Sequence, residues 1–125
     1  YEAAGVQAEL TPFIEDTASA FAHADIIVCR AGASTVTEIA AVGAAAIFVP
    51  FPSAVDDHQT TNAQFLVGAG GGWLVQQSDL TPEGLAKMLL NSERTALVDI
   101  AEKAKNMQKI NATREVVAAC EELSA

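Results

Sequence analysis

Short apolar runs alternate with longer alanine-rich stretches along this chain. Residues 26–29 and 46–49 are uninterrupted apolar runs, a pattern typical of strands that are covered on both faces of a parallel sheet. Residues 6–10 and 73–75 are further short runs that predict strands. In the remaining segments, apolar residues recur at helical spacing. The predicted helices are residues 15–23, 34–42, 58–67, 82–90, 94–107 and 112–123.

Capping and turn residues in the sequence indicate where several of these helices begin or end. Thr81 before Pro82 predicts an N-cap followed by proline at the first helical position, and Gly43 predicts a helix end. The glycine-rich residues 68–72 follow a helix, so they predict a helix-to-strand turn and no phosphate-binding fingerprint. Strands that alternate with helices in this way predict right-handed βαβ units. We therefore expect one α/β, Rossmann-like three-layer domain with a parallel sheet, spanning residues 1–125.

Composition excludes two broad classes of protein. Hydrophobic residues make up 50% of the chain and charged residues 18%, which excludes an intrinsically disordered chain. Gly43, Pro50 and Pro52 break the longest apolar stretches before they reach the roughly 20 residues of a membrane span. The sequence starts at Tyr1, with neither Met nor a basic segment. We therefore expect no signal peptide, and we expect the sequence to be a piece of a longer protein.

The charge distribution limits the possible ligands. The formal net charge is −9, and Arg30 is the only basic residue between Tyr1 and Leu80. Non-specific nucleic-acid binding requires clustered Lys and Arg, so nucleic acid is not an expected partner. A phosphate bound in this half of the chain would have to be held by backbone N–H groups and helix N-termini.

Several other chemistries lack the residues they need. Cys29 and Cys120 have no metal-ligand spacing and are expected to be buried or inert thiols in a reducing compartment. His58 has no second ligand at a suitable spacing, so no metal site is predicted. Ser34 and Ser53 have no interpretable histidine and acid partners, which excludes a Ser-His-Asp hydrolase.

Candidate ligand-binding loops follow the predicted strands. In open α/β sheets, ligands bind outside the carboxyl ends of the strands. This rule selects residues 11–16, 30–35, 51–59 and 76–79, which we expect to lie side by side. The small residues of 30–35 lead into a helix N-terminus, which favours an anion site without cations. A tight turn with no ligand is an equally good interpretation.

Glu38 and the polar residues after position 55 each allow two interpretations. Glu38 fits a capping box with Thr35, but it also lies where a carboxylate can accept hydrogen bonds from a ribose diol. Asp56 or Asp57 is expected to be the N-cap of the next helix. His58 and Gln59 would then occupy its first turn, where they can reach a polar ligand or remain solvated.

Several motifs occur together in the order of a known family. Residues 28–40 (VCRAGASTVTEIA) resemble the nucleotide-sugar signature of the MurG family of UDP-N-acetylglucosamine transferases of peptidoglycan synthesis. The similarity continues through residues 47–52 (IFVPFP), 56–59 (DDHQ) and 62–63. Upstream, residues 12–16 (PFIED) look like the uracil loop of that family. The resemblance implies that this chain is the C-terminal, donor-binding half of a GT-B glycosyltransferase.

The resemblance also implies contacts for the nucleoside. Phe13 and Ile14 would frame the uracil, with backbone groups of Ile14 reading its edge. Glu38 would hold the ribose hydroxyls. The resemblance leaves the role of Arg30 open between a phosphate and a neighbouring carboxylate.

The diphosphate and the sugar would lie further along the same edge. By the same resemblance, Ala33, Ser34 and Thr35 would offer backbone N–H groups and hydroxyls to the diphosphate. His58 and Gln59 would contact the GlcNAc unit of UDP-GlcNAc.

The family resemblance places the remaining machinery outside this chain. The N-terminal domain of the family holds the lipid-linked acceptor, the proposed general base and a membrane-facing patch. We therefore expect no catalytic residue, no cofactor and no metal here, and an isolated chain that is inactive. The full-length protein would be cytoplasmic and peripheral on the cytoplasmic face of the membrane, making lipid II from lipid I with inversion. The alternatives are a soluble subunit that docks on a separate membrane partner and a fold with a vestigial site.

Overall fold

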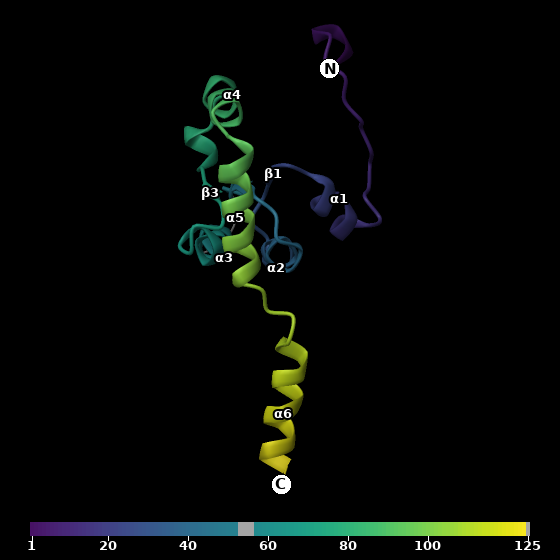
Figure 1. Ribbon diagram of the computed structural model, residues 1–125, viewed down its shortest axis with the longest axis vertical. Helices are drawn as coiled ribbons and strands as arrows, with labels where there is room; N and C mark the ends of the chain where they lie inside the picture. The colour runs from purple at the N-terminus through teal and green to yellow at the C-terminus, as the bar shows by residue number, and fades with distance from the viewer. Residues whose placement is uncertain (53–56, 125) are drawn as a thin grey trace.

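A three-stranded parallel sheet organises the described part of the chain. The computed structural model describes residues 1–52 and 57–124. Strands β1 (Ile27–Cys29), β2 (Ala46–Phe48) and β3 (Trp73–Leu74) lie in the order β1-β2-β3 (Figure 1). Val28 is in register with Ile47, and Phe48 with Leu74. These strands confirm the predicted runs at 26–29, 46–49 and 73–75 and their parallel pairing.

Helices connect and follow these strands in the predicted order. The sequence predicted each α-helix to within two residues at either end. The elements are 3₁₀ helix η1 (Glu2–Ala4), α1 (Thr17–His23), α2 (Ala33–Val42), α3 (His58–Val67), 3₁₀ helix η3 (Gln77–Asp79), α4 (Pro82–Leu90), α5 (Arg94–Asn106) and α6 (Ala112–Ser124).

Capping explains where these helices start and stop. The Thr81 hydroxyl accepts a hydrogen bond from Gly84 N–H at 3.0 Å, which confirms it as the N-cap of α4. Gly43 ends α2 in the left-handed conformation at φ 77°, as predicted. Helix α1 starts two residues later than expected, because the Asp16 carboxylate accepts from Ser19 N–H at 2.9 Å and so caps the helix.

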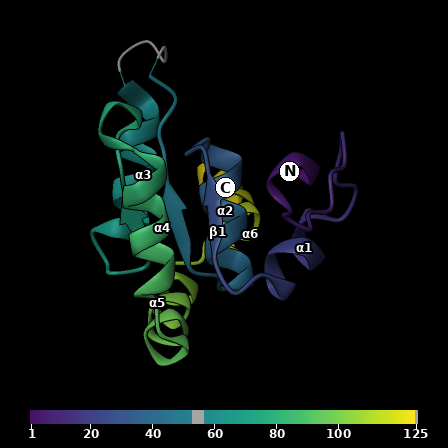
Figure 2. The same cartoon turned by 90° about the horizontal axis from the view of Figure 1, so that it is seen from above.

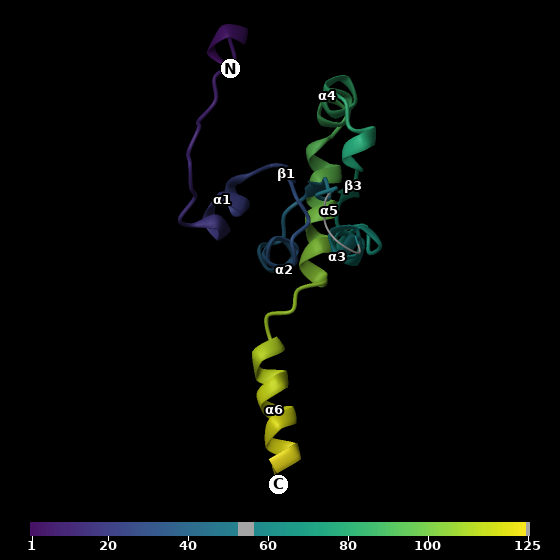
Figure 3. The same ribbon diagram turned by 180° about the vertical axis from the view of Figure 1, so that it is seen from behind.

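The N-terminal segment differs from the prediction. Residues 6–10 form no strand, and residues 1–16 are all exposed. A strand needs a neighbouring backbone to pair with, and the apolar run alone does not supply one. Figures 1 and 3, seen from opposite sides, show this segment standing apart from the sheet and α6 extending away from the other helices.

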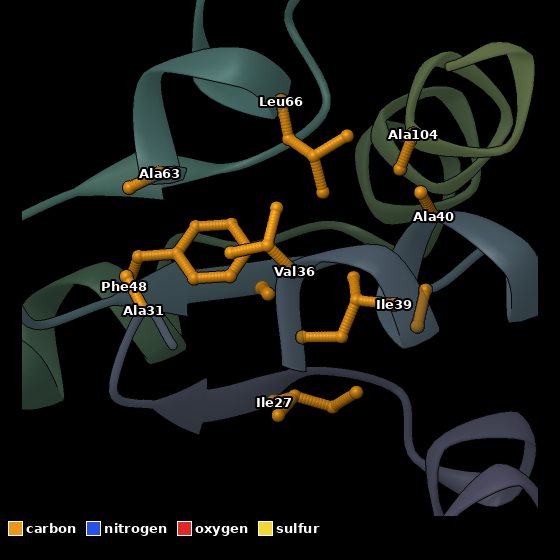
Figure 4. Close-up of a cluster of buried hydrophobic side chains, with 11 residues drawn as sticks. Ile27, Ala31, Val36, Ile39, Ala40, Phe48, Ala63, Leu66 and Ala104 are labelled. Atoms are coloured by element: carbon orange, nitrogen blue, oxygen red, sulfur yellow. The ribbon is translucent and has the colours of Figure 1, made fainter. Parts of the chain in front are cut away.

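The core lies between the sheet and the helices α2, α3 and α5. Strand β2 is central, and all three of its residues are buried. Figure 4 shows the Phe48 ring beside Val36 and below Ala63 and Leu66, with Ala104 next to Ala40 in the same cluster. The predicted turn at 68–72 allows α5 to approach closely, because a Cβ on Gly71 would lie 2.9 Å from the backbone of Ala104.

The second face of the sheet is less covered than predicted. Val28 is 46% exposed, so the expectation that residues 26–29 are covered on both faces is wrong at this position. The reason is that β1 is an edge strand in the described sheet. Val28, Val49 and Leu80 line a hollow of about 390 Å³ on this side, next to η3. Figure 2 gives a view of β1 with α4 and α5 to one side and α1 to the other.

Candidate functional site

Three strand-end loops meet at one edge of the sheet. Because the strands are parallel, the chain leaves Cys29, Phe48 and Leu74 at the same edge. The side-chain oxygen of Gln59 joins the first two loops, accepting from Phe51 N–H at 2.8 Å and Ala31 N–H at 3.2 Å. Gln76, in the loop after β3, donates from its side-chain nitrogen to the Thr60 hydroxyl on α3 at 3.1 Å. The structure therefore confirms that three of the four predicted loops are neighbours, and we call this edge the rim.

Helix α2 begins at the rim with its first-turn N–H groups directed outward. Its N-cap is Gly32, which has no side chain with which to cap them. The exposed residues Ala33 and Ser34 open the helix, and Thr35 is half-buried behind them. The positive end of the α2 helix dipole therefore lies at the rim.

Glu38 lies in the second turn of α2, which rules out the capping-box interpretation. That motif requires Thr35 to be the N-cap, and Thr35 is instead the third residue of the helix. The exposed Glu38 carboxylate shares a shallow hollow of about 360 Å³ with Ala33, Ser34 and Thr37. A carboxylate and a helix N-terminus are thus side by side.

The fourth predicted loop, residues 11–16, is connected to α2 through the start of α1. It follows no strand and leads into α1, whose first hydroxyl, on Thr17, donates to the Glu38 carboxylate at 3.3 Å. Phe13 and Ile14, just upstream, are 77% and 49% exposed. The structure therefore links this segment to Glu38 through Thr17 and leaves both apolar side chains accessible.

The first turn of α3 supplies the other predicted residues. His58 is its first residue and is exposed, and Gln59 is half-buried. Asp57 is the N-cap, as predicted, but its carboxylate accepts from the Thr60 hydroxyl at 2.6 Å. Ser53 and Asp56 lie outside the described residues. The side-chain oxygen of Gln59 accepts from the backbone N–H groups of Ala31 and Phe51.

The Arg30 side chain bonds to the loop that follows β2. One guanidinium nitrogen donates to the backbone oxygens of Val49 and Pro50, both at 3.3 Å. The guanidinium also lies 5.5 Å from the centre of the Phe51 ring. Arg30 therefore ties the loop after β1 to the loop after β2.

Comparison with known proteins now identifies the family. Residues 1–119 match the Glycosyltransferase family 28 C-terminal domain. The chain belongs to glycosyltransferase family 28. This membership confirms the resemblance drawn from residues 28–40.

The family 28 relatives are much longer than this chain. It is 75% identical over 125 residues to the UDP-N-acetylglucosamine--N-acetylmuramyl-(pentapeptide) pyrophosphoryl-undecaprenol N-acetylglucosamine transferase of Paracidovorax citrulli, covering 100% of this chain and 35% of the relative. The protein of the same name from Polaromonas naphthalenivorans is 77% identical over 124 residues, which are 99% of this chain and 34% of that one. The chain thus spans about a third of the length of these relatives.

A solved family 28 structure confirms the fold. The crystal structure of MurG from Acinetobacter baumannii superposes with a TM-score of 0.85 at 49% sequence identity, covering 91% of this chain and 35% of that one. The predicted fold, the C-terminal half of a GT-B glycosyltransferase, is therefore correct.

Among residues 1–52 and 57–124, no three His, Cys, Asp or Glu side chains are grouped to hold a metal ion. No helix in the same part of the chain is long and apolar enough to cross a membrane.

The two thiols of the family 28 chain differ in environment. Burial raises the pKa of the Cys29 thiol from 9.0 to about 11, whereas Cys120 is exposed on α6. Of the two thiols predicted to be buried or inert, Cys120 is therefore not buried. At about pH 8 we expect iodoacetamide to modify Cys120 first, because the thiolate is the reacting form and Cys29 remains protonated. Peptide mass spectrometry measures both rates.

The pH dependence provides the check on this prediction. The rate at Cys29 should still rise above pH 9 and reach half of its maximum only near pH 11, because the folded thiol ionises late. A Cys120→Ser variant should lose the fast reaction. A Cys29 that reacts as fast as Cys120 would contradict the assigned environment.

Proposed function

We propose that this chain binds UDP-GlcNAc as the donor half of an inverting N-acetylglucosaminyltransferase. The complete enzyme would transfer GlcNAc to a lipid-linked muramoyl pentapeptide, converting lipid I to lipid II. Family membership and the printed names of the longer relatives support this proposal.

The observation that carries the proposal is the start of α2. Its first-turn N–H groups face the rim beside the Glu38 carboxylate. A diphosphate suits such a site, because the N–H groups and the helix dipole both favour negative charge. With Arg30 bonded to backbone oxygens, recognition would depend on Ala33, Ser34 and Thr35.

The remaining parts of the donor have nearby groups of suitable chemistry. Glu38 would accept hydrogen bonds from the ribose diol. Phe13 and Ile14, linked to Glu38 through Thr17, would cover the uracil. His58 and Gln59, on the first turn of α3, would face the sugar.

The chain by itself would not catalyse transfer. Glycosyl transfer requires donor and acceptor to be aligned in one cleft. The acceptor site, the general base and the contact with the cytoplasmic face of the membrane would belong to the rest of a longer protein. The relatives carry the matching segment within chains about three times as long, which favours this arrangement over a separate docking subunit.

Calorimetry tests the donor site. We expect UDP-GlcNAc and UDP to bind, and UMP to bind more weakly because it lacks the second phosphate. Absence of heat with both UDP and UDP-GlcNAc at millimolar concentration would overturn the proposal.

An Ala33→Pro variant tests the role of the α2 backbone. Proline is tolerated at the first position of a helix, and Gly32 already has the extended conformation (φ −61°, ψ 149°) that a residue before proline prefers. The variant removes one N–H group and should weaken UDP binding while keeping the melting temperature. Unchanged affinity would mean that this N–H group does not contact the diphosphate.

A chimera tests the proposed reaction. Residues 1–125 would replace the matching segment of the Paracidovorax citrulli relative, which is 75% identical. We expect the chimera to transfer GlcNAc to the lipid-linked acceptor, and a chimera that also carries Glu38→Ala to lose most of that activity. A folded chimera that binds UDP-GlcNAc but transfers nothing would count against the transferase.

A further inference from the structure

The backbone of Ala31 is held on both sides by one helix. Ala31 is fully buried and directly precedes Gly32, the N-cap of α2. Its N–H group donates to the side-chain oxygen of Gln59 at 3.2 Å, and its carbonyl oxygen accepts from the side-chain nitrogen of Asn62 at 3.0 Å. Both side chains come from the first turns of α3.

The N–H and carbonyl groups of Ala31 determine which atom each side-chain amide, of Gln59 and of Asn62, presents to the backbone. Its N–H group needs an acceptor, so Gln59 must present its oxygen. Its carbonyl needs a donor, so Asn62 must present its nitrogen. Residues three apart in a helix lie on the same face, which allows both amides to reach one residue. We call this arrangement the Ala31 clamp.

The same turn of α3 reaches the other two strand-end loops. The Gln59 oxygen also accepts from Phe51 N–H, in the loop after β2. The Thr60 hydroxyl accepts from the side-chain nitrogen of Gln76, in the loop after β3, at 3.1 Å. Residues 59–62 therefore connect all three loops of the rim.

We propose that Gln59 and Asn62 are positioning residues that fix the start of α2 before the donor arrives. This inference rests on the proposed function. The clamp holds the residue beside the N-cap, so it sets where the first-turn N–H groups of α2 point. A buried backbone group that loses its partner drives a local rearrangement, and here that rearrangement would displace the diphosphate site.

Two amide-to-carboxylate substitutions, one at each residue of the clamp, should differ in their effect on UDP affinity. Gln59→Glu keeps the oxygen that the clamp uses, whereas Asn62→Asp removes the nitrogen that it uses. Both add one negative charge at the rim, so this effect is matched between them. We expect Asn62→Asp to bind UDP at least about tenfold more weakly than Gln59→Glu, since the lost hydrogen bond leaves a buried carbonyl unpaired.

UDP is the appropriate probe because it lacks the sugar. If Gln59 acted only as a sugar contact, Gln59→Leu would leave UDP affinity unchanged and weaken only UDP-GlcNAc. The clamp predicts that Gln59→Leu weakens both ligands by about tenfold. Thr61→Ala, an exposed position on the same turn, is the matched control and should change neither. Equal UDP affinities for Gln59→Glu and Asn62→Asp would overturn the clamp.

Amide hydrogen exchange tests the clamp without any ligand. In the unliganded, unchanged chain, the Ala31 N–H group should exchange slowly. This protection should persist in Gln59→Glu and be lost in Gln59→Leu. Fast exchange of Ala31 in the unchanged chain would overturn the clamp even if a variant failed to fold. Failure of the unchanged chain to bind UDP would instead count against the proposed function, so the two failures are distinguishable.

Discussion

The Phe48→Ala variant is expected to lose about 4 kcal/mol of its free energy of unfolding. Phe48 is the largest of the fully buried side chains, at 0% exposure. Its strand is paired on both sides, so the backbone cannot move in to fill the space that alanine would leave. Chemical denaturation followed by circular dichroism measures the loss.

A second phenylalanine provides the matched control. Phe65 on α3 is 37% exposed, so Phe65→Ala removes the same atoms from a site that water already reaches. We expect it to cost about 1 kcal/mol, as is usual for a partly exposed position. Equal losses in the two variants would contradict the assignment of Phe48 to the centre of the core.

The same burial explains why the sequence predicted the sheet well. Residues 46–49 read as an uninterrupted apolar run because β2 has a strand on each side and helices above it. A capping residue such as Thr81 bonds to a backbone N–H group only a few residues away, so it could be recognised without knowledge of the fold.

Features that depend on distant partners could not be predicted in this way. Residues 6–10 have the composition of a strand, but composition does not show whether a neighbouring strand is available. The exposure of Val28 has the same origin, because an apolar residue of an edge strand looks the same in sequence as one of a central strand.

The sequence predicted which residues lie at the candidate site better than it predicted their hydrogen-bond partners. Sequence placed Ser34 and Gln59 in the loops or first helical turns after strands, and Glu38 in the helix beside them. The structure confirms that the loops after β1, β2 and β3 adjoin. Sequence reasoning missed Asn62 as a partner of Ala31, and it did not anticipate that Arg30 bonds to the backbone oxygens of Val49 and Pro50. The amide spacing of Gln59 and Asn62 was visible, but the buried backbone that they satisfy belongs to a loop 28 to 31 residues away.

Glu38→Ala is the substitution that tests the proposed nucleotide site most directly. We expect the Kd for UDP to rise about 30-fold, since a charged acceptor for the ribose diol is lost. In the free protein Glu38 is exposed and accepts one hydrogen bond, from Thr17, so unfolding should change by only about 0.5 kcal/mol. Calorimetry and thermal unfolding together separate the two effects, and Glu121→Ala on the exposed helix α6 controls for the lost charge.

Pairing this variant with 2′-deoxy-UDP localises the effect to the ribose. The unchanged chain should prefer UDP over 2′-deoxy-UDP, because only UDP offers the 2′-hydroxyl to the carboxylate. Glu38→Ala should bind the two ligands equally. Removing the carboxylate and the 2′-hydroxyl together should therefore lower the binding affinity no more than removing the carboxylate alone. A Glu38→Ala variant that keeps the full preference for UDP would show that another group holds the ribose. In that case the hollow beside Ala33 and Ser34 would have to receive a different part of the donor.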